Sequence, residues 1–404
     1  MKSRILILLC SLLPSLGWCQ FSEQISQKVT LKVNTNIETY FIAEKLAVDH
    51  IGNYVFSNKE STFEHQPLVY FAYQHFKIWK NRPIILRVSE ILKQLRDVQH
   101  DNAQQLEYLL YVNEFPKTGF RLPPPKDLAI YDNQRYPGTE ALVTELTDSL
   151  ASFYKQAQVG DFLKANRRFY RGALKEAKRH INTKAIPYME KWYGQKFAGY
   201  EFYLMPGMPI TKGADNYRAF GPMLSSPGGK VSAMVFSSSI ELPLKKKLKD
   251  YRHFGFDNAQ VIRFLTVHEV GHSFVNPLLS QMKSSIQRNN VLFTPSFKKS
   301  LEASYIENWE VCITEHLVRL GEIRIAKAMG DKKEELRLRK MHTHEFGFVL
   351  LPMLETLIVL YENNRNQYNN FNSFLPIIFQ KLNELGPEDV DKLVKASQIQ
   401  SKTI

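Results

Sequence analysis

The sequence predicts an α+β fold that is mostly helical, and three observations support this. Apolar residues recur at helical spacing through most of residues 37–192. Short stretches typical of strands follow between residues 199 and 236. Two further helical patterns occupy residues 261–275 and 307–319. We therefore expect a mainly helical N-terminal region over residues 20–198, and a second domain over residues 199–404 with a small sheet.

The N-terminal region opens with Val29–Val33, which alternates like a strand, and continues with a helix over Ile37–Val48. A long basic and aromatic stretch, Phe162–Trp192, is also expected to be helical, with an interruption near Pro187. The other helices that the spacing predicts between them are 68–79, 88–95, 105–112 and 139–156.

The second region begins with strands. We expect them at Glu201–Met205, Tyr217–Leu224 and Val231–Phe236, with Ser226-Pro-Gly-Gly229 as a turn. The dipeptide Asn276-Pro277 predicts the end of the helix that starts near residue 261. Two later helices are expected over residues 346–362 and 371–382.

The pentapeptide His268-Glu269-Val270-Gly271-His272 lies inside the apolar run 261–275. Histidines at i and i+4 of a helix point to nearly the same side, which suits two imidazoles binding one Zn²⁺. Glu269 points about 100° away and can take a proton from a metal-bound water. Gly271 is costly inside a helix, so we expect another chain segment to approach the backbone there.

A third protein ligand must come from elsewhere. Val275 and Leu278 occupy the positions where an extended pattern would need glycine and a third histidine, which excludes that class. A second helix offers Glu315, which has Arg319 one turn away and an apolar wall of Val311, Cys312 and Val318. Glu315 is our first choice. The open alternatives are Glu310 and then Glu302, Glu307 and Glu322.

Three segments together carry a family resemblance. They are Thr266–Pro277, the helix with Trp309 and Glu315-x-x-x-Arg319, and the element from Asn216-Tyr217 to Gly221-Pro222. The chain resembles an uncharacterised family of secreted bacterial proteins regarded as gluzincin-type zinc metallopeptidases. The resemblance implies a zincin-like catalytic domain, zinc ligands His268, His272 and Glu315, and Glu269 as catalytic base. It implies no substrate.

On this hypothesis a zinc-activated water hydrolyses a peptide bond in a peptide or protein substrate. Tyr305 and His344 are our first candidates for stabilising the oxyanion, and His316 and Tyr361 are alternatives. Val231–Ser238 is our candidate for an edge strand that pairs with the substrate. The nearby His342, His344 and Glu345 are a weak candidate for a second metal site. The alternative function is a non-catalytic zinc-containing or surface-binding exported protein.

The first residues favour export. A basic start, the apolar stretch Ile5–Leu13 and small residues near Cys19 are typical of a secretory signal peptide over residues 1–19, cut before Gln20. Lipid attachment at Cys19 is disfavoured by the bulky Trp18. The apolar stretch is too short for a membrane span, and no later segment is long enough. We expect a secreted or periplasmic protein in which Cys312 is the one remaining cysteine and is buried.

The formal net charge is +13. This charge favours weak attraction to anionic surfaces. No alternation of basic and aromatic residues marks a nucleic-acid groove, so we expect no specific nucleic-acid partner. Basic clusters occur at 178–180, 245–249 and 337–340, and we interpret them as solvated faces.

Overall fold

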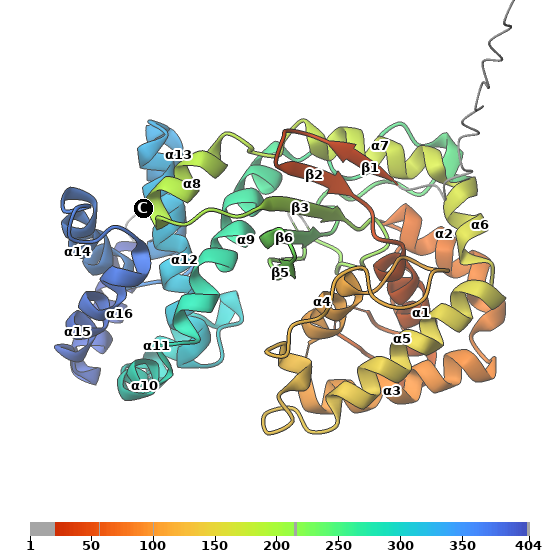
Figure 1. Cartoon of the computed structure of the whole chain (residues 1–404), viewed down its shortest axis with the longest axis horizontal. Coiled ribbons are helices and arrows are strands. Elements are labelled where there is room, and N and C mark those ends of the chain that lie inside the picture. Colours follow the sequence, from red (N-terminus) through yellow and green to blue (C-terminus); the bar gives the residue numbers. More distant parts are fainter. Residues whose placement is uncertain (1–20, 56, 100, 214–215, 402–404) are drawn as a thin grey trace, which may run out of the picture.

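The computed structural model describes residues 21–55, 57–99, 101–213 and 216–401. The predicted signal peptide therefore lies outside the described residues. Figure 1 shows a small central sheet, with helices α1–α5 on one side and α10–α16 on the other. The fold is α+β and mostly helical, as expected. Among the described helices, none is long and apolar enough to cross a membrane.

The sheet is mixed and runs in the order β1-β2-β3-β6-β4, with β5 also paired to β6. The β2–β3 and β3–β6 pairs are parallel, with Val29 opposite Tyr200 and Gly199 opposite Val231. The other pairs are antiparallel. The strands are β1 (Ser22–Gln24), β2 (Val29–Lys32), β3 (Gly199–Leu204), β4 (Ala219–Phe220), β5 (Met223–Ser226) and β6 (Gly229–Phe236).

Two findings about the sheet differ from the expectations. The segment Val231–Ser238 is not an edge strand, because β6 pairs with β3 on one side and with β4 and β5 on the other. The edge next to β6 is instead β4–β5, one strand interrupted at Gly221-Pro222, where Tyr217–Leu224 was expected to be continuous. In addition, the sheet takes β1 and β2 from the N-terminal region, so the two predicted regions share it.

The N-terminal helices surround α1. Because α2–α5 pack around it, all residues of α1 from Asn36 to Val48 are buried. The Asn34 side chain caps α1 by accepting from the Ile37 N–H at 3.0 Å. The helices are α1 (Thr35–Ile51), α2 (Pro67–Phe76), η1 (Lys77–Trp79), α3 (Pro83–Gln99), α4 (Ala103–Tyr111), η2 (Ala129–Tyr131) and α5 (Thr139–Gln156).

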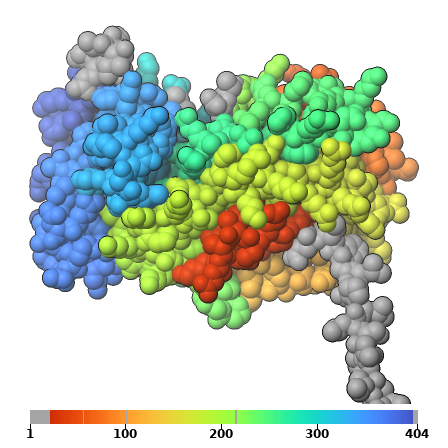
Figure 2. All heavy atoms as spheres, turned by 90° about the horizontal axis from the view of Figure 1, so that it is seen from above, coloured from red at the N-terminus to blue at the C-terminus, as the bar shows by residue number. Residues whose placement is uncertain are grey.

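The stretch Phe162–Trp192, predicted to be helical with an interruption near Pro187, is divided among three helices. They are α6 (Val159–Ala165), α7 (Arg167–Lys178) and α8 (Ala185–Tyr193). The break falls before α8, and Pro187 lies within the first turn of α8, where a proline costs least. Helix α7 packs against β2 and β3. Figure 2 shows α7 between the red strands β1–β2 and the green segment around residues 245–255.

The remaining helices form the C-terminal part. Helix α9 does not end at Asn276-Pro277 but continues to Leu279, with Pro277 inside it. These helices are η3 (Leu248–Asp250), α9 (Ala259–Leu279), α10 (Lys283–Arg288), η4 (Asn289–Leu292), α11 (Pro295–Ser300), η5 (Glu302–Ser304), α12 (Trp309–Ala328), α13 (Lys332–Lys340), the π-helical turn η6 (Met341–Glu345), α14 (Leu351–Asn363), η7 (Phe371–Phe374), α15 (Leu375–Asn383) and α16 (Pro387–Ser401).

Helices α9 and α12 pack closely where α9 has Gly271. A Cβ built at Gly271 would lie 3.2 Å from Cγ1 of Val318 on α12. This confirms the prediction that another segment approaches the backbone at Gly271. The close packing sets the two helices at the distance that the site between them requires.

Candidate metal centre

Helix α9 carries the two histidines of the pentapeptide. The side chain of Asn258 caps the helix by accepting from the Val261 N–H at 3.2 Å. One turn of helix separates His268 from His272, and their Nε2 atoms lie 3.4 Å apart. The two rings are perpendicular. Both Nε2 atoms therefore face one point.

The third member of the site comes from α12, which is capped by Asn308 through a 3.0 Å bond from the Val311 N–H. The Glu315 carboxylate lies 3.4 Å from His272 Nε2 and 3.8 Å from His268 Nε2. These three residues form a group that could hold a metal ion. Of the predicted alternatives, Glu315 is the one that lies in this group, while Glu302, Glu307 and Glu310 are exposed.

Glu322, two turns after Glu315 on α12, contacts His268 on the side of the ring that faces away from the site. It accepts from His268 Nδ1 at 2.6 Å and from Nε2 of the buried His342 at 2.7 Å. Arg319 donates to His342 Nδ1 at 3.2 Å and pairs with Glu315 at 3.0 Å. The chain of contacts therefore leads from one candidate ligand, His268, to another, Glu315.

The second histidine, His272, also has a polar contact at its Nδ1 atom. His272 Nδ1 lies 3.2 Å from Oδ1 of Asn276, one turn further along α9. Because Pro277 does not end the helix, Asn276 faces His272 and does not form a helix cap. Because an acceptor lies beside each Nδ1 atom, we place one proton of each imidazole there, so Nε2 is the atom that faces the site and would bind a metal ion once it is unprotonated.

These residues fit a tetrahedral zinc ion. Ligand atoms at 2.0–2.1 Å from zinc lie about 3.3 Å apart. The two Nε2 atoms lie 3.4 Å apart, His272 Nε2 lies 3.4 Å from Oε1 of Glu315, and His268 Nε2 lies 3.8 Å from Oε2 of Glu315, which is close to this spacing. Three protein ligands leave one position open, which distinguishes a catalytic from a closed structural site.

The charges around the site keep its carboxylates ionised. Burial opposes ionisation of Glu315, but Arg319 and the two histidines hold the pKa of its carboxyl well below the ordinary value. In the same way His342 and His268 outweigh burial and lower the pKa of Glu322 to about 2. Burial alone would lower the pKa of His272, but Glu315 and Glu269 raise it to about 9. A metal ion must therefore displace a proton from His272.

Glu269 has a different environment from the other acids of the site. It is buried, and among the described residues its carboxylate makes no hydrogen bond or ion pair. Burial raises its pKa, which the two histidines partly offset. The edge strand passes directly beside it, since a Cβ at Gly221 would lie 2.1 Å from the Glu269 carbonyl oxygen.

Tyr217, just before β4, reaches the same place. Its ring lies 6.4 Å from that of Phe264, which stacks on His268 at 5.1 Å. Tyr217 is half-buried, and burial raises the pKa of its phenol to about 12. The charges of Arg319, Glu322 and Glu269 also act on this hydroxyl. It therefore stays a neutral donor at neutral pH.

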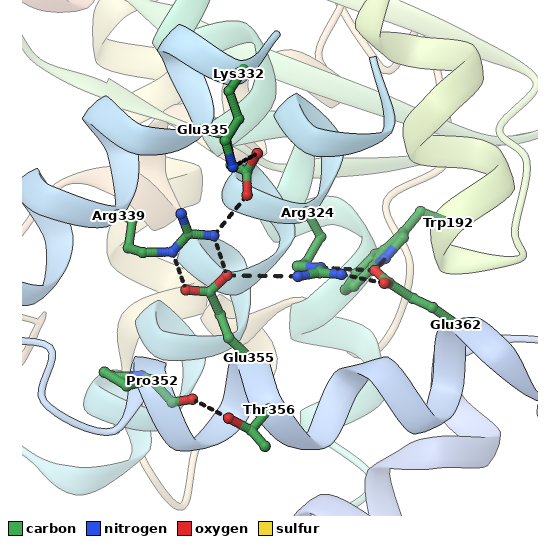
Figure 3. A network of polar contacts seen from close by, with 9 residues as sticks. All are labelled: Trp192, Arg324, Lys332, Glu335, Arg339, Pro352, Glu355, Thr356 and Glu362. Atoms are coloured by element: carbon green, nitrogen blue, oxygen red, sulfur yellow. Dashed lines mark hydrogen bonds and ion pairs between the residues drawn. The ribbon is translucent and has the colours of Figure 1, made fainter. Parts of the chain in front are cut away.

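A network of partly buried ion pairs fixes the far end of α12 (Figure 3). Arg324 of α12 pairs with Glu362 and, at 3.6 Å, with Glu355 of α14. Glu362 also accepts from the Trp192 indole at 2.9 Å, and Glu355 from Arg339 of α13 at 2.7 Å. The network joins α12 to the helix that precedes His342, and so supports the contact between Glu322 and His342.

The structure does not join the other predicted site residues to the three ligands. The Tyr305 side chain is 87% exposed at the end of η5, and no hydrogen bond or ring contact of the described residues links it to them. His344 is half-buried, and the site contact in η6 comes from His342. Tyr361 donates to the Trp192 carbonyl, and His316 lies 2.7 Å from the Cys312 carbonyl inside the core. Cys312 is buried, as expected.

The predicted second metal site at His342, His344 and Glu345 does not form a ligand group among the described residues. A second group does exist at Glu176, His253 and Asp257. However, Glu176 accepts from two backbone N–H groups, and Asp257 pairs with Arg179 at 2.8 Å. These contacts already occupy the carboxylates.

The fold and the cluster thus define an α+β protein with a His-His-Glu group between two closely packed helices. A family model described as a domain of unknown function (DUF4932) matches residues 29–380. The chain belongs to this family, whose match covers the sheet from β2 onward and the cluster. No curated protein and no solved structure matches the chain.

Proposed function

We propose that the chain is an exported zinc-dependent peptidase of the gluzincin type. One observation carries the proposal. Two imidazoles, fixed at Nδ1 by Glu322 and Asn276, converge with the ionised Glu315, while the unpaired, buried Glu269 lies beside them. A purely structural site has no use for such a carboxylate. Export rests on the pattern of residues 1–19.

His268, His272 and Glu315 would hold the metal. When bound, zinc lowers the pKa of water to about 7 and polarises a carbonyl group. The residues behind the ligands tune them, because Glu322 makes the His268 imidazole a stronger donor and Arg319 keeps Glu315 charged.

Glu269 is suited to moving a proton. Its raised pKa lies nearer neutrality than that of an ordinary glutamate, so it can accept a proton from water and pass it to the leaving amine. Glu269 lies beside His268 and His272, which would hold the zinc ion. It would therefore accept the proton close to the carbonyl group that the zinc ion polarises.

An extended peptide would pair with β4. The carbonyls of Arg218 and Pro222 accept from Ser237 and Ala233 beside them, so the alternate residues Ala219 and Gly221 direct their backbone groups outward. This outer edge passes Glu269 at Gly221. β-Strand addition there would place the scissile bond beside the candidate metal centre.

Tyr217 replaces Tyr305 and His344 as the proposed oxyanion donor. It precedes the same edge strand, and its neutral hydroxyl lies within the field of Arg319 and Glu269. A donor that stays protonated up to high pH can stabilise a developing negative charge throughout the neutral range.

The decisive experiment compares wild type with Glu269→Gln. We expect about one zinc per chain in both by elemental analysis, and cleavage of a peptide library by wild type alone. The loss should be at least 10²-fold in kcat/KM. Glu310→Gln, an exposed change on α12, is the matched control and should behave as wild type. Equal zinc and equal behaviour of wild type and Glu269→Gln would instead identify a non-catalytic zinc protein.

A further inference from the structure

Four cations line one side of α7. All four are exposed: Arg167, Arg168, Arg171 and Lys175. Residues three or four apart lie on the same face of a helix, so these cations are neighbours on the surface. Together with Gly172 and Phe254 they line a hollow of about 360 Å³. The Phe254 ring forms its floor, packed so closely on Gly172 that a Cβ there would lie 2.1 Å from it.

A second basic segment lies against this helix. Arg168 donates to the Lys249 carbonyl at 3.0 Å, which brings Lys246, Lys247 and Lys249 beside α7. Figure 2 shows the two segments in contact. We call the seven cations the α7 face: Arg167, Arg168, Arg171, Lys175, Lys246, Lys247 and Lys249. The two clusters are more than 70 residues apart in the sequence, so the sequence alone does not combine them.

A larger hollow of about 660 Å³ lies close to the first, since Asn166 in its wall is the residue directly before Arg167 of the first hollow. Its walls include the apolar side chains of Phe71, Phe162 and Leu248, and Lys246 and Lys247 lie at its rim. A basic hollow close to a partly apolar one fits an amphiphile with a negatively charged head.

The charges of the α7 face are uncompensated. Among the described residues, none of its seven cations forms an ion pair, although Asp161 and Asp250 are nearby. The end of the same helix differs, because Lys178 pairs with Glu23 at 3.0 Å and Arg179 with Asp257 at 2.8 Å. The unpaired charge is therefore local and is not a general result of the high net charge.

This arrangement opposes the stability of α7. A helix N-terminus is already positive, and acids are favoured there. The first turn of α7 holds Arg167 and Arg168 and no acid. These cations repel one another and the positive end of the helix dipole. A bound external anion would neutralise this repulsion.

We propose that the α7 face binds the phosphate headgroups of anionic phospholipids, with the larger hollow receiving part of an acyl chain. Each cation near an anionic bilayer contributes independently to binding, so seven on one face give substantial attraction. A single-stranded nucleic acid would need several exposed aromatic rings for base stacking, and this face offers only the half-buried Phe254. The proposal is independent of the candidate metal centre.

The test is sedimentation of the full chain with vesicles. Wild type should bind vesicles containing phosphatidylglycerol and not pure phosphatidylcholine vesicles, and binding should weaken with added salt. The triple variant Arg167→Gln, Arg171→Gln, Lys175→Gln should bind on the order of a hundredfold more weakly. Its melting temperature should equal or slightly exceed that of wild type, because cations that repel one another have been removed, and its zinc content should match wild type. These two results would show that the fold and the candidate metal centre are intact.

The matched control removes the same charge from exposed, unpaired cations of α10 and α11: Lys283→Gln, Arg288→Gln, Lys298→Gln. It should bind vesicles within about threefold of wild type. If the two triple variants lost vesicle binding equally, the binding would depend on the net charge alone and not on the α7 face. That result would overturn the proposal. Binding of soluble tripolyphosphate or RNA without binding of vesicles would overturn it as well.

Discussion

Two buried glutamates in different regions of the molecule have opposite pKa shifts. Glu322, behind the candidate metal centre, is bonded to two histidines, and its pKa falls to about 2. Among the described residues, Glu38 on α1 of the helical region accepts only from the Tyr170 hydroxyl and the Gly207 N–H, both at 3.0 Å. Burial raises its pKa to about 7.

The difference comes from the partners, since both side chains are almost fully buried. Basic partners stabilise the carboxylate ion, whereas two neutral donors do not offset the loss of water. The region around the candidate metal centre therefore stabilises charged side chains without a metal ion. The helical region holds a carboxyl that is easily neutralised.

Removing Glu322 should have the largest effect. Glu322→Ala leaves His268 and the buried His342 without their shared acceptor. We expect a loss of about 3–5 kcal/mol in the free energy of unfolding and a fall of about 10–100-fold in zinc affinity. Urea denaturation and competition with a zinc chelator measure the two effects. Glu310→Ala on the same helix should change stability by less than about 0.5 kcal/mol. Similar results for both variants would show that Glu322 does not support the site.

The helical region should respond to pH. The pKa of Glu38 is about 7 in the folded chain and 4.5 ordinarily, so its contribution is intact below pH 4.5 and is lost as the pH rises to about 7. The loss amounts to about 3 kcal/mol. Glu38→Gln does not titrate, so its stability should fall less than that of wild type between pH 5 and pH 8 in urea denaturation. Parallel pH profiles would mean that Glu38 is ionised throughout.

The smallest effect is expected on the α7 face, where the cations are exposed and form no ion pair with the described residues. Arg167→Glu replaces a cation with an acid in the first turn of α7. We expect the free energy of unfolding to rise by about 0.5 kcal/mol at low salt, because the acid suits the helix dipole. High salt should abolish the gain in thermal melting. A destabilised variant would contradict the strain inferred for this helix.

Local patterns were enough to predict the inner residues of the candidate site. The spacing of His268 and His272 follows from helical geometry, and Glu315 was preferred because Arg319 and an apolar wall lie on the same helix. These relations span one or two turns. The same is true of most helices, whose apolar spacing is local, although α9 ran through Pro277.

The residues behind the ligands depend on packing between distant elements. The sequence places Glu322 with Glu302 and Glu307, behind Glu315 and Glu310, because nothing in its own helix shows that His268 needs an acceptor. Its position seven residues after Glu315, on the same helix face, was the available signal. His342 contacts Glu322 only because η6 packs beside α12. No such contact with Glu322 is found for its neighbour His344 among the described residues.

The sheet edge was mispredicted for a similar reason. Alternation identifies β6 as a strand but says nothing about which strands flank it. The partners come from β3 and from β4–β5, and β3 pairs in turn with β2 near the start of the chain. Such pairing depends on the whole fold.

The parallel pairing of Val29 with Tyr200 has a consequence for biosynthesis. Strand β2 leaves the ribosome about 170 residues before its partner, which at roughly 5–20 residues per second is a delay of about ten seconds or more. During that time α1–α8 can assemble without a sheet, and β2 remains an open strand. A chaperone that holds this early segment should therefore increase the yield of folded chain, most of all when translation is slow.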